Sequence, residues 1–217
     1  HNFEKGADNF PIQEEYSKIR YFYECQAVLY GTVTMRDRYA NGLAKKIPVS
    51  SFQYPKEDYI AASGQQNYII SLDPDGILGW DTNCVEKAPF PNAHIVEVLT
   101  EQVSNDYLSY LRKYNISYIF AGRESLDCAL LLHKSAHLFG IERLMISGGG
   151  YTNWSFLQEN LVDELSLLIS PIADGNTSSV SIFEKGDFLP VKTPTAFSLK
   201  EVKVTAGDGV WLRYLIK

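Results

Sequence analysis

The chain alternates short apolar runs with longer amphipathic segments, and glycine, proline and acidic turn residues separate them. Short runs bounded by turn residues are typical of buried strands, whereas longer segments without glycine or proline are typical of helices. Strands are expected at 27–30, 68–72, 93–99, 117–121, 143–146, 163–170, 197–204 and 210–216. Helices are expected at 12–25, from a Ser104 cap to about residue 114, from a Ser125 cap to Gly140, and at 151–160.

The order of these elements predicts an α/β fold. Strand and helix alternate from residue 93 to residue 170, so crossover connections should build a mostly parallel central sheet with flanking helices. The last two strands flank a glycine-containing turn and predict a C-terminal antiparallel hairpin at an edge of the sheet. Segment 42–66 is expected to be a long loop, and segment 80–91 shows no clear period. No linker separates two hydrophobic halves, so residues 1–217 are expected to form a single domain.

Composition narrows the class of protein. Hydrophobic residues make up 45% of the chain, and the net charge is −6 with no block of lysine and arginine, which disfavours nucleic acid and anionic membranes as partners. No apolar run approaches the ~18 residues needed to span a bilayer, and no signal peptide is recognisable. The three cysteines are widely spaced, which is typical of a reduced protein. We therefore expect a cytoplasmic protein that acts on small molecules.

Three consecutive glycines, Gly148 to Gly150, stand between an expected strand and an expected helix. Backbone without side chains lets a phosphate approach closely, and a helix N-terminus offers free N–H groups and partial positive charge. The segment therefore predicts a phosphate or pyrophosphate site, with a tight strand-to-helix turn as the alternative. It matches neither the Walker A spacing, because no lysine follows, nor the Rossmann fingerprint, because the last glycine of that pattern is missing.

Two more glycines follow expected strands. Gly31 precedes hydroxyl side chains that include Thr34, and Gly122 precedes Arg123, a side chain able to pair with a phosphate. The ends of parallel strands lie along one edge of a sheet, where α/β proteins bind nucleotides. Taken alone, each position is also explained by a capped turn or a solvated loop.

The sequence shows no metal site or nucleophile motif. His133 and His137 lie four residues apart in one expected helix, but no glutamate follows the first and no third ligand is apparent, so no metal is expected. Cys128 falls in an apolar helical segment and is expected to be a core residue. The catalytic residues are left unassigned.

Three segments together resemble one known family. Segment 27–35 resembles its strand, glycine and threonine element, and segment 120–151 resembles its strand, helix, strand and glycine-loop module. Segment 154–175, with Leu-Val-Asp-Glu-Leu before Pro-Ile-Ala-Asp-Gly, resembles the family's helix, strand and turn. The family is that of the riboflavin-biosynthesis reductases, also known as the C-terminal domain of the bacterial bifunctional deaminase–reductase.

The resemblance implies a dihydrofolate reductase-like fold, NADPH as hydride donor, a homodimer, and reduction of a ribosylamino-pyrimidine phosphate to its ribityl form. The glycine loop would wrap the cofactor pyrophosphate, the first strand end would lie beside the phosphates, and the other strand ends would approach the adenine ribose and its 2′-phosphate. The cofactor-binding residues implied in this way are Gly31, Thr34, Ser71, Gly122, Arg123, Ser147, Gly148, Gly149, Gly150 and Tyr151.

Two departures from the family pattern leave the substrate open between pyrimidine and pteridine-like compounds. The family's glycine loop usually follows a glutamate, which is Ser147 here, and its opening Ser-x-Asp-Gly strand is not found before Gln13. One alternative is a dihydrofolate or pteridine reductase, which needs an acidic side chain on the helix that faces the pterin; Glu14, Glu15 and Glu24 are the candidates. The other alternative is a nucleotide-binding module without catalysis.

Overall fold

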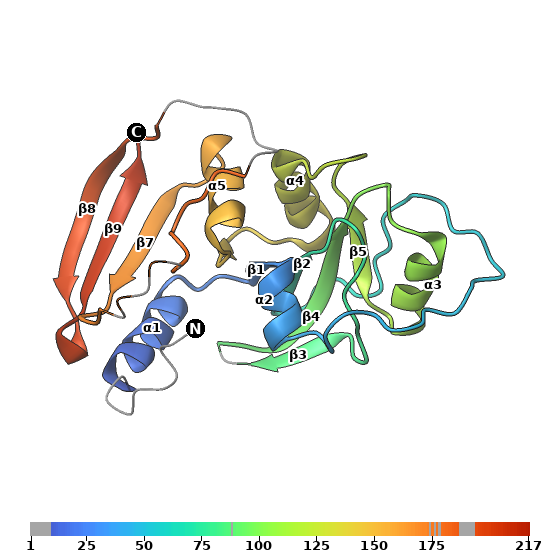
Figure 1. Ribbon diagram of the computed structural model, residues 1–217, viewed down its shortest axis with the longest axis horizontal. Helices are drawn as coiled ribbons and strands as arrows, with labels where there is room; N and C mark the ends of the chain where they lie inside the picture. Colours follow the sequence, from blue (N-terminus) through green and yellow to red (C-terminus); the bar gives the residue numbers. More distant parts are fainter. Residues whose placement is uncertain (1–9, 88, 174, 176, 178, 187–193) are drawn as a thin grey trace.

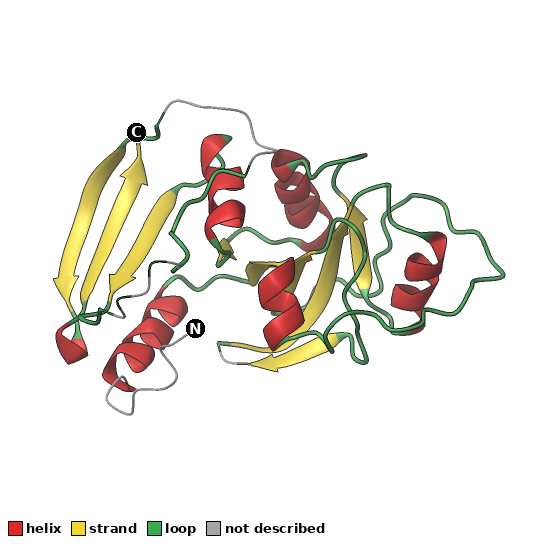
Figure 2. Cartoon of the chain, in the orientation of Figure 1, coloured by secondary structure: helices red, strands yellow, loops and turns green. Residues whose placement is uncertain are grey.

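The computed structural model describes residues 10–87, 89–173, 175, 177, 179–186 and 194–217. Two sheets with helices around them make up this part of the chain (Figure 1, Figure 2). The elements are α1 (Phe10–Phe22), β1 (Ala27–Gly31), α2 (Thr32–Arg38), β2 (Tyr68–Leu72), β3 (Cys84–Lys87), β4 (Phe90–Leu99), α3 (Asn105–Lys113), β5 (Ser117–Phe120), α4 (Cys128–Phe139), β6 (Leu144–Ile146), α5 (Gly150–Gln158), β7 (Glu164–Ile169), β8 (Phe197–Val204), the 3-10 turn η2 (Ala206–Asp208) and β9 (Val210–Ile216).

The main sheet confirms the predicted parallel arrangement. Strands β4, β2, β1 and β6 lie side by side in that order, and β5 pairs with the second half of β4; all these pairs are parallel. All five residues of β2 are buried, which is why this strand is a continuous apolar run in the sequence. The carboxyl ends of these strands therefore meet at one edge of the sheet.

Helices cover both faces of the main sheet and divide its core in two. One cluster packs Val28, Ile69 and Ile95 against α2 and α3. The other packs neighbouring residues of the same strands against α4 and α5. Cys128 belongs to the second cluster, as predicted, and burial raises the pKa of its thiol to about 12, so the thiol is unreactive at neutral pH.

Capping residues set the helix boundaries, and one predicted cap is wrong. The Ser104 side chain accepts a hydrogen bond from the Tyr107 N–H, and Gly140 ends α4 in the left-handed conformation, both as expected. The cap of α4 is Asp127, whose side chain accepts from the Leu130 N–H, and not Ser125. The Asp127 N–H also binds the carbonyl that precedes Gly122, so a turn occupies the intervening residues and the helix begins later.

The C-terminal hairpin forms as predicted, but it does not border the main sheet. Strand β9 lies between β8 and β7, and these three antiparallel strands make a separate sheet in the described part of the chain. Strand β3 was not predicted, since Cys-Val-Glu-Lys is short and half polar; it forms by pairing antiparallel with the first half of β4. None of the helices described here combines the length and apolar character needed to cross a membrane.

Candidate active site

The glycine loop lies at the edge where the parallel strands end. Strand β6 ends at Ile146, and Gly149 is the N-cap of α5 with extended backbone angles (φ −76°, ψ −178°). As a glycine, Gly149 has no side chain to cap the first turn of α5, so the N–H groups of that turn gain no side-chain acceptor from the N-cap. Together with the positive end of the helix dipole, these N–H groups fit the phosphate site predicted from the sequence.

The glycines at this edge have different structural roles. A Cβ on Gly148 would lie 2.4 Å from the Thr152 Cβ, and a Cβ on Gly31 would lie 2.8 Å from the Thr152 Oγ1. Thr152 of α5 therefore packs against both backbones and holds the end of β1 beside the loop. A Cβ on Gly150 would meet Glu184 at 2.6 Å, whereas a Cβ on Gly149 would meet nothing within 4 Å. Only Gly149 therefore leaves open space that a ligand can enter.

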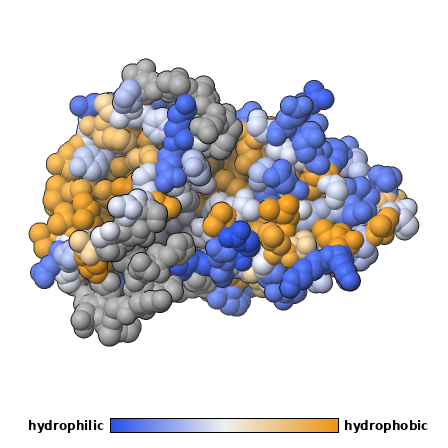
Figure 3. All heavy atoms as spheres, in the orientation of Figure 1, coloured by the Kyte–Doolittle hydropathy of each residue, from blue (hydrophilic) through white to orange (hydrophobic). Residues whose placement is uncertain are grey.

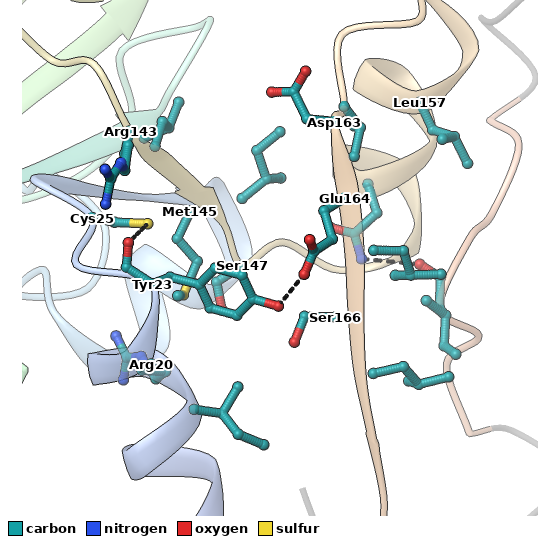
Figure 4. Close-up of a pocket in the computed structure, with 18 of the residues that line it drawn as sticks. Arg20, Tyr23, Cys25, Arg143, Met145, Ser147, Leu157, Asp163, Glu164 and Ser166 are labelled. Atoms are coloured by element: carbon teal, nitrogen blue, oxygen red, sulfur yellow. Dashed lines mark hydrogen bonds between the residues drawn. The ribbon is translucent and has the colours of Figure 1, made fainter. Parts of the chain in front are cut away.

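A cavity of about 400 Å³ separates the two sheets next to the loop. It is lined by residues 142–147, which lead into and include β6, by residues 161–168, which lead into and include most of β7, and by one face of α1. Figure 4 shows Arg20, Met145 and Ser147 on one side and Glu164 and Ser166 of β7 on the other. A volume of this size is in the range of small-molecule sites.

Ser147 joins the cavity to the glycine loop. It is the residue that precedes Gly148, it lines the cavity, and its Oγ lies 3.4 Å from the Tyr16 hydroxyl of α1. Its backbone N–H donates to the Leu29 carbonyl of β1, which fixes its position. A ligand bound at the loop and a ligand in the cavity would therefore meet at Ser147.

The β7 wall carries a carboxylate whose negative charge is balanced by neighbouring cations. Glu164 accepts hydrogen bonds from the Tyr23 hydroxyl, the Arg213 guanidinium and the Lys200 ammonium. Burial would raise the pKa of Glu164, but these bonds outweigh it and lower the pKa to about 2. Glu164 is therefore ionised and paired at neutral pH, and it has no proton to donate.

The other residues predicted at the site are spread along the same edge. Gly122 and Arg123 follow β5, which β4 and β2 separate from β1. The Arg123 Nε lies 3.5 Å from a carboxylate oxygen of Glu101. Because the Arg123 side chain is 86% exposed, it is still available to a ligand. Thr34 lies in the first turn of α2, directly after Gly31, and Tyr151 is exposed in the first turn of α5. Ser71 is fully buried within β2, one residue before the end of that strand.

Ser71 belongs to a buried polar cluster that the sequence analysis missed. It pairs in register with Glu97, which is also fully buried and whose two carboxylate oxygens have no hydrogen-bond partner among the residues that the structure describes. Burial and the nearby Asp73 raise the pKa of Glu97 well above its ordinary value, which favours its protonated form. The sequence signal for this cluster was the single glutamate within the otherwise apolar second half of β4.

The two histidines on α4 do not approach this site. The rings of His133 and His137 stack on the exposed surface of the helix, with centroids 6.1 Å apart. Among the residues described, no group of three or more histidine, cysteine or acidic side chains could hold a metal.

Comparison with known proteins places the chain beside pyrimidine reductases. Residues 81–211 match the family described as the RibD C-terminal domain. The 2,5-diamino-6-ribosylamino-4(3H)-pyrimidinone 5′-phosphate reductase of Methanothermobacter thermautotrophicus is 29% identical over 119 residues, which is 55% of this chain and 54% of that protein. The reductase of the same name from Archaeoglobus fulgidus is 35% identical over 68 residues, 31% of each chain. The matches thus span about half or less of these relatives.

Solved structures show the same fold. A pyrimidine reductase-like protein from Corynebacterium diphtheriae superposes with a TM-score of 0.64 at 15% identity, over 94% of this chain and 80% of its own. RibD from Acinetobacter baumannii superposes with a TM-score of 0.57 at 16% identity, over 98% of this chain and 51% of its own. At these identities the likeness concerns the fold, and it agrees with the expected α/β reductase architecture.

Proposed function

Because the chain belongs to the RibD C-terminal domain family, we propose that it is an NADPH-dependent reductase of the riboflavin-biosynthesis type. Its substrate would be a ribosylamino-pyrimidine phosphate, the class named for its relatives. The observation that carries this proposal is the junction at Ser147, where an uncapped helix N-terminus and a small-molecule cavity meet. A reductase needs this arrangement because hydride transfer requires the two ligands in contact.

The glycine loop and the strand ends would hold the cofactor. Gly149 and the first N–H groups of α5 would bind its pyrophosphate, with Gly31 and Thr34 alongside. Arg123, exposed at the far end of the same edge, would pair with the 2′-phosphate. The bound nicotinamide supplies the hydride; the chain's own residues orient the two ligands and exclude water between them.

The face of α1 toward the cavity argues against a pteridine reductase. The α1 residues that line the cavity are Tyr16, Ile19 and Arg20, and none of them is acidic. Two of the candidate acids, Glu14 and Glu15, are both engaged by Lys18; the Glu14 side chain is 69% exposed and that of Glu15 is 14% exposed. The acidic side chain that a pterin requires is therefore absent from the part of α1 that the structure describes at the cavity.

Thermal unfolding with NADPH and with NADH tests the cofactor part of the proposal. Ligand at ~100 times its dissociation constant adds about 2.7 kcal/mol of stability, which raises the unfolding temperature of a domain this size by several degrees. A rise with NADPH followed by NADPH oxidation with a ribosylamino-pyrimidine phosphate supports the reductase. A rise without oxidation by any pyrimidine or pterin favours the nucleotide-binding module, and no rise contradicts both.

The second sheet offers a surface for the expected homodimer. Residues paired across its strands point to the same face, and one face is apolar throughout the three strands. Val204, Leu199 and Val202 on this face are 72%, 57% and 54% exposed. Figure 3 shows apolar atoms gathered at the end of the molecule where β8 and β9 lie. Such a face can pack against its own copy as two sheets do in a sandwich.

A further inference from the structure

The buried polar cluster at the ends of β2 and β4 lies on the face of the main sheet that α3 covers. Five of its side-chain atoms are buried and have no hydrogen-bond partner among the residues that the structure describes: Ser71 Oγ, Asp73 Oδ1, Trp80 Nε1 and both carboxyl oxygens of Glu97. A buried polar atom without a partner costs free energy. Five such atoms in one cluster therefore need a common explanation.

The two acids of the cluster are bound differently. Asp73 Oδ2 accepts hydrogen bonds from the Ile77 and Leu78 N–H groups at 2.8 and 2.9 Å, and from the Tyr107 hydroxyl at 2.9 Å. Burial raises the pKa of Asp73, but these three bonds favour its ionised form. Glu97 accepts no such bond, and burial together with the Asp73 charge raises its pKa well above the ordinary value. Of the two acids, Glu97 is therefore the one that holds a proton more readily.

No cation balances the two acids. In the described part of the chain, no lysine, arginine or histidine forms an ion pair with Asp73 or Glu97. The other titratable groups around them are neutral tyrosines or further acids: Tyr30 of β1, Tyr107 and Tyr110 of α3, and Asp75 and Asp81 of the loop after β2. Two carboxylates in this place would repel each other strongly, because the surroundings are buried. Neutralisation therefore falls to a proton.

We propose that Glu97 and Asp73 share a single proton at neutral pH, and that this proton holds segment 73–80 against the main sheet. A protonated Glu97 has one O–H to donate, and Asp73 Oδ1 is the acceptor that lacks a donor. The remaining Glu97 oxygen can accept from the Ser71 hydroxyl and the Trp80 indole N–H, the two donors that act on this carboxyl. One proton thus gives a partner to all five atoms.

The segment held in this way joins three strand ends at the edge of the sheet. The Leu72 carbonyl accepts from Thr32 Oγ1, the first residue of α2, at 2.6 Å. The Pro74 carbonyl accepts from the Thr100 N–H and Oγ1 directly after β4, at 3.0 and 2.8 Å. When the pair loses its proton to solvent, the two buried negative charges should detach segment 73–80 and loosen the ends of β1, β2 and β4 together.

Denaturant unfolding of the full chain at several pH values counts the shared proton. Glu97→Gln is the informative variant, because its amide donates to Asp73 as the protonated acid does but does not titrate. Relative to this variant, the unfolding equilibrium constant of wild type should rise about tenfold for each pH unit between pH 5 and pH 7, as for one proton bound by the folded state alone. Glu101→Gln is the matched control. It removes an exposed acid four residues later, and its ratio to wild type should change less than twofold for each pH unit.

A second variant tests whether the proton is shared. Asp73→Asn offers an N–H to Glu97 and removes the repelling charge, so Glu97 no longer needs its proton. The rise relative to Glu97→Gln should then fall well below tenfold for each pH unit. A full tenfold rise in Asp73→Asn, or the same pH dependence in wild type and Glu97→Gln, would overturn the assignment.

Infrared spectroscopy of wild type keeps the test decisive if the variants do not fold. With glutamate carboxyl groups labelled with carbon-13, the folded chain at pH 7 should show the label-shifted carbonyl band of one protonated glutamate. Absence of that band contradicts the shared proton. All of these measurements use the chain without ligand, so their outcome is independent of the proposed function.

Discussion

Substitution of Gly149 by alanine separates cofactor binding from folding. The backbone angles at Gly149 are open to any residue, and an added Cβ would contact nothing within 4 Å. Alanine at such a position restricts the unfolded chain and stabilises a protein by about 0.4–1 kcal/mol. Because Gly149 is the N-cap of α5, where glycine is preferred over alanine by a similar amount, the two effects roughly cancel, and we expect Gly149→Ala to unfold at about the same denaturant concentration as wild type.

The same methyl group should weaken NADPH binding. It would occupy the open space beside Gly149 at the N-terminus of α5, where the pyrophosphate would have to approach. Displacement of one charge-assisted backbone hydrogen bond costs about 1.5–3 kcal/mol, which corresponds to a roughly 10- to 100-fold higher dissociation constant.

Gly148→Ala is the contrasting variant. Its Cβ would fall 2.4 Å from the Thr152 Cβ, so the loop or α5 must move, and overpacking of this kind costs about 1–3 kcal/mol. Denaturant unfolding and a fluorescence titration with NADPH, run on both variants and wild type, provide the measurement. If Gly149→Ala binds NADPH as tightly as wild type, the cofactor does not bind at this loop and the reasoning is refuted.

Three further predictions concern charge and association. Glu97→Gln removes this titration. Because the folded pKa of Glu97 is raised above its ordinary value of 4.5, the acid destabilises the fold increasingly as pH rises above 4.5, so the variant should gain stability relative to wild type as the pH of urea unfolding is raised from 5. Glu164→Gln should act in the opposite sense. Its lowered pKa gives stability that is present above pH 4.5 and lost as pH falls toward 2, so the variant should lose roughly 2–3 kcal/mol at pH 7 and little at pH 2. Val204→Lys should shift a dimer to monomer in analytical ultracentrifugation without changing NADPH binding, because Val204 is 72% exposed and its substitution disturbs no core; an unchanged dimer would exclude this face as the interface.

The main sheet could be predicted because its strands are buried on both faces. Strands such as β2 are continuous apolar runs between turn residues, and a helix with a recognisable cap or end follows several of them. Strand β3 could not be predicted, since its four residues carry no such pattern and its pairing with β4 depends on the rest of the sheet. The separate second sheet was missed for a similar reason: the choice of partner for β7 is a tertiary property.

The cavity face of α1 shows where a sequence pattern was present but ambiguous. Tyr16, Ile19, Arg20 and Tyr23 follow the 3, 4, 7 spacing of a single helix face, and all of them line the cavity. In the sequence this stripe looks like an ordinary partly buried face with one long cation whose stem could lie on apolar surface. The structure shows what holds this cation: its Nη2 donates to the Tyr30 hydroxyl, and its guanidinium lies over the Tyr16 and Phe90 rings. The spacing along the chain could not show this, because Tyr30 and Phe90 come from other elements and reach α1 only through the tertiary fold.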